Sequence, residues 1–110
     1  MSDELATMRL DRSEGSLVVH LSGEIDLSNA QELHRQLESR IGSHSRVIVN
    51  LADVEYLDSQ GLRLIMQLCS KVDRDQTELS LVAPPGGVAR QVLELARMHD
   101  YVEIRDALED

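Results

Sequence analysis

Alternating apolar positions near the start of the sequence predict two short β-strands. Apolar residues alternate with others over 8–10 and again over 17–21, so the apolar side chains of each run would share one face of a strand. Glu14-Gly15 lies between the two runs, and such a dipeptide is typical of a hairpin turn. The opening segment is therefore predicted to be a β-hairpin.

A helical repeat follows the hairpin. Its apolar positions recur at intervals of three and four residues: Ala30, Leu33, Leu37 and Ile41. Asp26 or Ser28 is a suitable N-cap for this helix, because a short polar side chain can accept a hydrogen bond from the free N–H groups of the first turn. Gly42 follows the repeat and predicts the end of the helix.

The second half of the chain alternates strand-like and helix-like segments. The β-branched run 47–49 predicts a strand buried on both faces. The other expected elements are a helix over 62–72, a strand over 79–82, a helix over 88–96, a strand over 102–104 and a terminal helical turn over 106–109. This order predicts an α/β layer structure with parallel strand pairs, formed by one domain that spans 1–110.

Composition narrows the classes of function. Hydrophobic residues make up 42% of the chain, as in a globular protein, and 11 basic against 20 acidic residues give a net charge of -9. This charge argues against nucleic acid as a partner, since phosphate contacts need clustered Lys and Arg. The acidity has two interpretations, solubility and electrostatic steering toward a basic partner surface.

The expected compartment is the cytoplasm. Cys69 is the only cysteine, so no disulfide can form within the chain. The residues 1–4 are acidic and lack the basic and apolar regions of a signal peptide. No apolar run approaches the roughly 20 residues that cross a membrane, so no membrane partner is expected either.

Ser59 is the central candidate for chemistry. It follows Asp58 at the predicted start of the second helix, where Asp58 or Ser59 can act simply as an N-cap. The functional alternative is phosphorylation, because a helix N-terminus favours a negative charge and a phosphate would add nearly two charges beside Asp58.

Catalysis by Ser59 is a weaker hypothesis. A nucleophile elbow has glycine two residues before and two residues after the serine, and only Gly61 is present, with Leu57 in the other position. None of the four histidines stands in a triad context, and no pair of His or Cys has metal-ligand spacing. We therefore expect neither enzymatic activity nor a cofactor or metal. A small hydrolase that uses Ser59 is the least favoured hypothesis.

The second helix has an unusually wide apolar arc. At about 100° per residue, its apolar positions span roughly 200°, about twice what a surface helix needs. Two interpretations stay open. Either the helix is buried between two neighbours, or Leu64 and Leu68 form an exposed apolar patch for a partner next to Ser59.

Two stretches of the chain resemble a known family. Gly23-Glu24-Ile25-Asp26 and the segment 49–62, which contains Asp58-Ser59-Gln60-Gly61-Leu62, are similar to the anti-sigma factor antagonists, the single-domain members of the STAS group. The likeness covers nearly the whole chain with the same order of elements. It implies a STAS-like α/β fold with a small mixed sheet of four to five strands and helices packed mainly on one face.

The resemblance also implies a partner-switching function. In this family the unphosphorylated antagonist binds an anti-sigma factor that is also a serine kinase, and the kinase phosphorylates a serine that matches Ser59. A PP2C-type phosphatase reverses the modification. The residues expected to contact the partner are Asp26, Asp58, Gln60, Gly61, Leu64 and Leu68.

One position departs from the family pattern. Many members have Ser or Thr where this chain has Gln60, so Ser59 is the only hydroxyl of the motif. The departure also fits a branch with a different partner. The alternative function is therefore a structural STAS subunit of a lipid-transport or signalling complex that has no phosphorylation switch.

Overall fold

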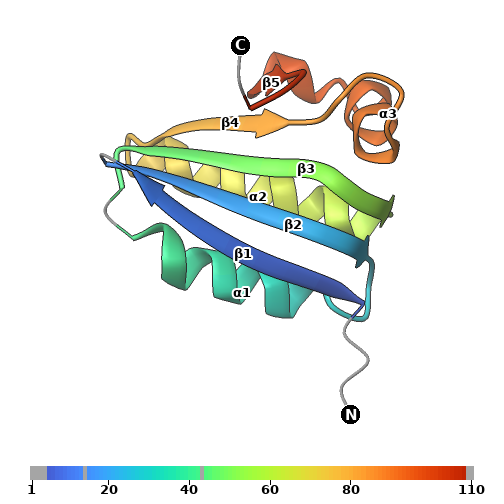
Figure 1. The fold of residues 1–110 in the computed structure, drawn as a ribbon, viewed down its shortest axis with the longest axis horizontal. Helices are drawn as coiled ribbons and strands as arrows, with labels where there is room; N and C mark the ends of the chain where they lie inside the picture. Colours follow the sequence, from blue (N-terminus) through green and yellow to red (C-terminus); the bar gives the residue numbers. More distant parts are fainter. Residues whose placement is uncertain (1–4, 14, 43, 109–110) are drawn as a thin grey trace.

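The protein forms one five-stranded sheet with two long helices against one of its faces (Figure 1). The computed structural model describes residues 5–13, 15–42 and 44–108. In chain order the elements are β1 (Ala6–Ser13), β2 (Ser16–Ile25), α1 (Ala30–Ile41), β3 (Arg46–Leu57), α2 (Ser59–Arg74), β4 (Glu78–Val82), α3 (Val88–Leu95), the short 3-10 helix η1 (Met98–Asp100) and β5 (Glu103–Arg105). The predicted α/β class and the mixed sheet are confirmed.

The strands lie side by side in the order in which they occur along the chain. Only β1 and β2 are antiparallel, and β2, β3, β4 and β5 run parallel. The predicted hairpin is present, with Ser13 opposite Ser16. Gly15 has a φ of +82°, which glycine adopts without strain, whereas Glu14 lies outside the described residues. Each parallel pair needs a crossover connection, and α1 and α2 supply the first two.

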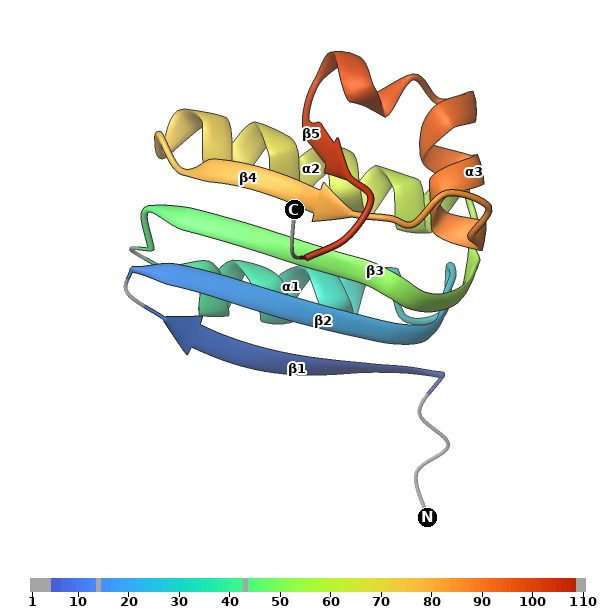
Figure 2. The ribbon, with the colours of Figure 1, turned by 45° about the horizontal axis from the view of Figure 1, so that its top comes forward.

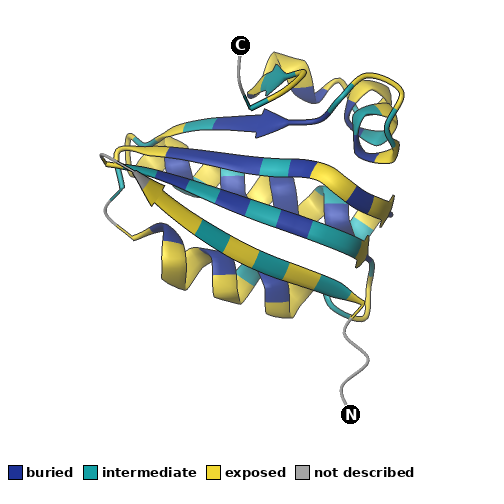
Figure 3. Cartoon of the chain, viewed as in Figure 1, coloured by how far each residue is buried: buried dark blue, intermediate teal, exposed yellow. Residues whose placement is uncertain are grey.

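The helices α1 and α2 both lie behind the sheet in two views of the molecule (Figures 1 and 2). Their apolar stripes pack against the central strands, and the buried residues of Figure 3 concentrate on β2, β3, β4 and the inner sides of these helices. Val47, Ile48 and Val49 are all buried, which confirms the prediction for this run. The edge strand β1 is exposed or half-buried from Ala6 to Arg12.

The strand β3 is much longer than its β-branched run. It continues to Leu57, although in its second half every third residue is buried, at Leu51, Val54 and Leu57, instead of every second one. The pairing with β2 shifts register between His20 and Ser22 and again at Gly23, which breaks the two-residue period. Gly23 has a φ of +92°, and a β-carbon there would collide with the carbonyl oxygen of Leu5. The irregularity therefore explains the glycine of the Gly23-Glu24-Ile25-Asp26 motif.

The end of the chain differs from its prediction. Residues 106–108 form bends instead of a helical turn, and Glu109 lies outside the described residues. The Arg90 guanidinium in α3 donates to the carbonyl oxygen of Ala83 and to the carboxylate of Asp106, both at 2.8 Å. These bonds hold Asp106 against α3, and Arg105 also donates to the carbonyl oxygen of Leu108 at 2.9 Å. Side-chain bonds thus replace the helical turn.

None of the helices in the described residues is suited to crossing a bilayer. Among residues 5–13, 15–42 and 44–108, no helix combines the length and the apolar character that a membrane span requires.

Candidate functional site

Two loops meet at the carboxyl ends of β2 and β3. Ile25 pairs with Leu57 at the last position of the two strands, and the N–H of Asp58 donates to the carbonyl oxygen of Ile25 at 3.3 Å. Asp26 follows Ile25, and Asp58 and Ser59 follow Leu57, so these residues lie at the same edge of the sheet. This edge is where α/β proteins commonly place their binding sites.

The carboxylate of Asp26 organises its own loop. Its Oδ1 accepts hydrogen bonds from the N–H of Ser28 at 2.8 Å and from the hydroxyl of Ser28 at 2.6 Å. The hydroxyl bond is the main cause that lowers the pKa of Asp26, so this carboxylate is negatively charged at neutral pH. The expectation that Asp26 or Ser28 caps α1 is wrong. Asn29 precedes the helix, and its side chain donates instead to the carbonyl oxygen of Glu24.

Asp58 is the N-cap of α2, and Ser59 is the first residue of the helix. The Oδ1 atom of Asp58 accepts from the N–H groups of Gln60, at 2.9 Å, and Gly61, at 3.1 Å. Ser59 is exposed, and its hydroxyl makes no hydrogen bond with any residue that the structure describes. The capping task therefore falls to Asp58 and leaves the Ser59 hydroxyl available.

Gly61 is buried where α2 comes down onto the strand ends. A β-carbon at this position would collide with the side chain of Leu57 and would lie 3.1 Å from Cγ2 of Ile25. Glycine thus lets the first turn of α2 approach the ends of β2 and β3 closely, which sets the height of Ser59 above the sheet. Direct contact of Gly61 with a partner is hindered by its burial.

The predicted apolar patch at Leu64 and Leu68 is wrong. Leu64 is 2% exposed and Leu68 is fully buried, because α2 packs on the sheet and against α1 at the same time. The apolar arc reaches solvent at its opposite side, where Met66 is 50% exposed. A sequence signal for this existed: Met66 follows Ser59 by seven residues, which is two helical turns.

The exposed face of α2 carries a line of residues that begins at Ser59. We call this line the Ser59 stripe; its members are exposed and recur at helical spacing: Ser59, Arg63, Met66 and Ser70. A hollow of about 210 Å³ separates the stripe from α1, and Gln60, Arg63 and Leu64 line it from α2. Gln60 therefore faces this groove, beside the stripe.

Each histidine contacts a residue other than Ser59. His20 Nε2 lies 3.0 Å from Asp11 Oδ2, and its Nδ1 lies 3.0 Å from the side-chain amide of Asn50. His34 contacts Glu38, and His44 contacts the carbonyl oxygen of Ile41. His99 contacts Asp100. Burial raises the pKa of the Cys69 thiol, so the reactive thiolate is disfavoured. The residues that the structure describes thus place no general base against Ser59.

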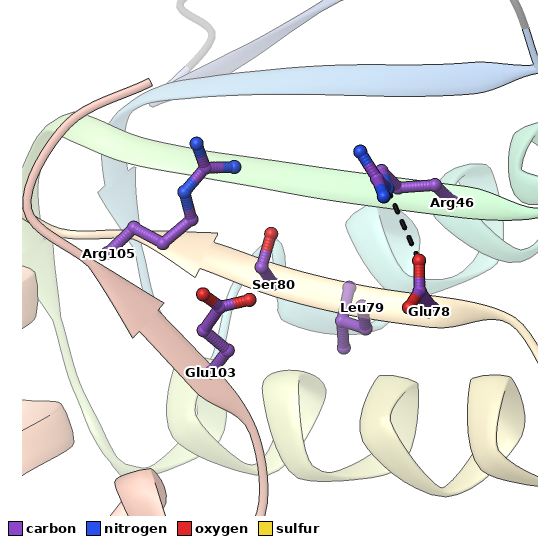
Figure 4. Close-up of a pocket in the computed structure, with 6 residues that line it drawn as sticks. All are labelled: Arg46, Glu78, Leu79, Ser80, Glu103 and Arg105. Atoms are coloured by element: carbon purple, nitrogen blue, oxygen red, sulfur yellow. Dashed lines mark hydrogen bonds and ion pairs between the residues drawn. The ribbon is translucent and has the colours of Figure 1, made fainter. Parts of the chain in front are cut away.

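A second hollow opens on the sheet over β4 and β5 (Figure 4). It has a volume of about 440 Å³, and two arginines and two glutamates surround Ser80 there. Arg46 Nε lies 3.3 Å from Glu78 Oε2, so opposite charges partly neutralise each other. Arg46 begins β3 whereas Ser59 follows its end, so this hollow is separate from the Ser59 site.

Comparison with known proteins establishes the family. A model of the STAS domain matches residues 7–110. The chain therefore belongs to the STAS domain family, as the Gly23-Glu24-Ile25-Asp26 and Asp58-Ser59 motifs indicated.

Several similar proteins bear the name of anti-sigma factor antagonists. BtrV of Bordetella bronchiseptica, which is named as an anti-sigma factor antagonist, is 28% identical over 90 residues, covering 81% of this chain and 77% of BtrV. The crystal structure of an anti-sigma factor antagonist from Mycobacterium paratuberculosis has a TM-score of 0.86 at 25% identity, over 96% of this chain and 89% of that one. Unphosphorylated SpoIIAA shares the fold, with a TM-score of 0.74 at 19% identity over 94% and 90% of the two chains.

Proposed function

We propose that this protein is an anti-sigma factor antagonist that acts by partner switching. In its unphosphorylated form it binds an anti-sigma factor that is also a serine kinase, and phosphorylation of Ser59 by that kinase releases it. A PP2C-type phosphatase restores the binding form. The observation that carries the proposal is the Ser59 hydroxyl, which is exposed and unbonded among the described residues because Asp58 caps the helix in its place.

The relatives support this role. BtrV and the Mycobacterium paratuberculosis protein are both named as antagonists of anti-sigma factors. SpoIIAA, which has the same fold, has also been solved in a phosphorylated form, with a TM-score of 0.69 to this chain. Because the fold accommodates a phosphate in SpoIIAA, the same fold is compatible with phosphorylation in this protein.

The physical effect of the phosphate is local. It would add about 1.5 to 2 negative charges at the start of α2, next to the carboxylate of Asp58. The hydroxyl is exposed and forms no bond within the described residues, so its modification disrupts no packing. Binding would weaken because the new charges must be desolvated or repelled at the interface, while the fold stays the same.

The proposed partner surface combines charged and apolar groups. Asp26, Asp58 and Gln60 supply polar contacts at the strand ends, as the resemblance suggests. The apolar contact comes from Met66, since Leu64 and Leu68 are buried. Leu27, 74% exposed in the loop after Asp26, adds a second apolar group at the same edge. The surface thus has a small apolar centre with a charged rim, as in many transient interfaces.

Incorporation of phosphate tests the site of modification. We expect that the kinase captured from lysate of the source cells with the unphosphorylated protein as bait will transfer one phosphate to Ser59 in the presence of ATP. Mass spectrometry should find it on the peptide that contains Ser59, and Ser59→Ala should remove it. Ser70→Ala is the matched control, because Ser70 is also exposed on α2, and it should be phosphorylated normally. Phosphate on another residue would exclude Ser59 as the switch.

The apolar contact makes a separate prediction. Met66→Asp should weaken binding to the captured partner at least tenfold, which is about 1.4 kcal/mol, because an apolar interface contact becomes a charge. The melting temperature should change little, since Met66 is half exposed. Leu95→Asp is the control, because Leu95 is 88% exposed on α3 and stands outside the surface. Equal affinities of the Met66→Asp variant and the native protein would remove Met66 from the interface.

A further inference from the structure

We propose that Arg63 is the internal counter-ion of phosphorylated Ser59, so that phosphorylation both adds negative charge and withdraws a positive one from the partner surface. The inference rests on the proposed function, which supplies the phosphate, and it concerns the state of the site afterwards. Both residues belong to the Ser59 stripe, and Arg63 follows Ser59 by four residues in α2.

Two of the backbone N–H groups at the start of α2 are already bonded. Free N–H groups in the first turn of a helix commonly bind anions. Here Asp58 already accepts from the N–H groups of Gln60 and Gly61. The Asp58 carboxylate also adds a negative charge next to Ser59. A cation from a side chain would therefore stabilise a dianionic phosphate at this position.

Arg63 is the side chain best placed to supply that cation. Residues four apart on a helix have β-carbons about 5 to 6 Å apart, and an acidic group placed N-terminal to a basic one is the favourable order. Arg63 is exposed and makes no ion pair with any residue in the described part of the chain. The nearby His34 is engaged differently, with its Nδ1 atom 3.2 Å from Glu38 Oε1.

Arginine also suits the geometry of a phosphate. Its planar guanidinium donates two parallel hydrogen bonds to two oxygens of one phosphate, which lysine cannot do. No backbone change is needed, because the helix already holds both residues on one face. Rotation about side-chain bonds alone brings the guanidinium to the phosphate.

The pairing changes the groove as well as the charge. Before phosphorylation Arg63 forms part of the wall of the hollow between α1 and α2, together with Gln60 and Leu64. A guanidinium that turns toward Ser59 leaves this wall. The net charge of the Ser59 and Arg63 pair goes from about +1 to between about -0.5 and -1. An acidic group of the partner that met Arg63 would then face a surface of its own sign.

The test uses protein with phosphoserine encoded genetically at position 59, so that no kinase is required. The second ionisation of the phosphate is followed by ³¹P NMR between pH 4 and 8 on the full chain. We expect the pKa of the phosphate to be lower by about half a pH unit with Arg63 than in Arg63→Gln, because the guanidinium stabilises the dianion. Arg63→Lys should retain part of the effect.

The control is Arg12→Gln. Arg12 is an exposed arginine in β1, and the pairing of Arg12 with Leu17 and of Leu17 with Val47 places it at the opposite end of the sheet from Ser59. Its loss should leave the phosphate titration at the native value. In ¹⁵N spectra the Arg63 Nε–H signal should shift on phosphorylation, whereas that of Arg12 should not.

The same titration curve for native and Arg63→Gln protein would overturn the proposal. So would an Arg63 Nε–H signal that is unchanged by phosphorylation. Failure of the proposed function gives a different result, since equal affinity of both forms for the partner would remove the switch without affecting this titration. The two ideas are therefore tested independently.

Discussion

Leu68→Ala is expected to lower the free energy of unfolding by about 2 to 5 kcal/mol. The Leu68 side chain is fully buried in the core between α2, α1 and the sheet. Truncation removes the transfer free energy of its methyl and methylene groups and leaves a cavity that packed neighbours fill only in part. A loss of this size is a large fraction of the roughly 5 to 15 kcal/mol that stabilises a typical domain.

Urea unfolding followed by circular dichroism measures this change. The midpoint should fall with little change in slope, since the same surface is exposed on unfolding. Met66→Ala is the matched control on the same helix. Met66 is half exposed, so its truncation should cost less than about 1 kcal/mol. Similar costs for the two variants would contradict the orientation of α2.

The main elements were predictable because their periodicity is local. The hairpin, the repeat that ends at Gly42 and the buried run 47–49 each follow from residues within a few positions of one another. The full extent of β3 was not predictable, because it depends on the register shifts at Ser22 and Gly23 in the neighbouring strand. The segment 106–108 likewise depends on Arg90, which is distant in sequence.

In the candidate site, too, some features follow from adjacent residues and others depend on the folded structure. The cap formed by Asp58 and the position of Ser59 at the helix start follow from adjacent residues. The conformation of the Asp26 loop does not follow from adjacent residues. Asn29 occupies the N-cap position of α1, and the Asp26 carboxylate accepts a hydrogen bond from Ser28.

The apolar arc of α2 shows why the docking residues were misplaced. An apolar arc of roughly 200° indicates that the helix packs against more than one neighbouring element. It does not indicate which edge of the arc faces solvent. Packing against α1 covers the edge with Leu64, so the edge with Met66 is left exposed. The tertiary structure determines which edge is exposed, and it also places Arg63 on the exposed face between Ser59 and Met66.

The size of the switch determines whether it is useful. A tenfold change in affinity, about 1.4 kcal/mol, is enough to move a partner between two complexes at comparable concentrations. Nearly two added charges at an interface that excludes water can supply this amount, since a charge that is desolvated without a partner is costly. Ser59→Ala should therefore bind in all conditions. Ser59→Asp should bind poorly, although one carboxylate carries less charge than a phosphate.

Calorimetric titration of the partner captured from lysate with native and Ser59-phosphorylated protein tests the central claim most directly. Circular dichroism on both forms provides the check that the fold is unchanged. We predict that phosphorylation weakens binding at least tenfold, about 1.4 kcal/mol, and that Ser59→Ala binds as tightly as the unmodified protein. Equal affinities for the native and phosphorylated forms would contradict the switch and favour a constitutively bound STAS subunit.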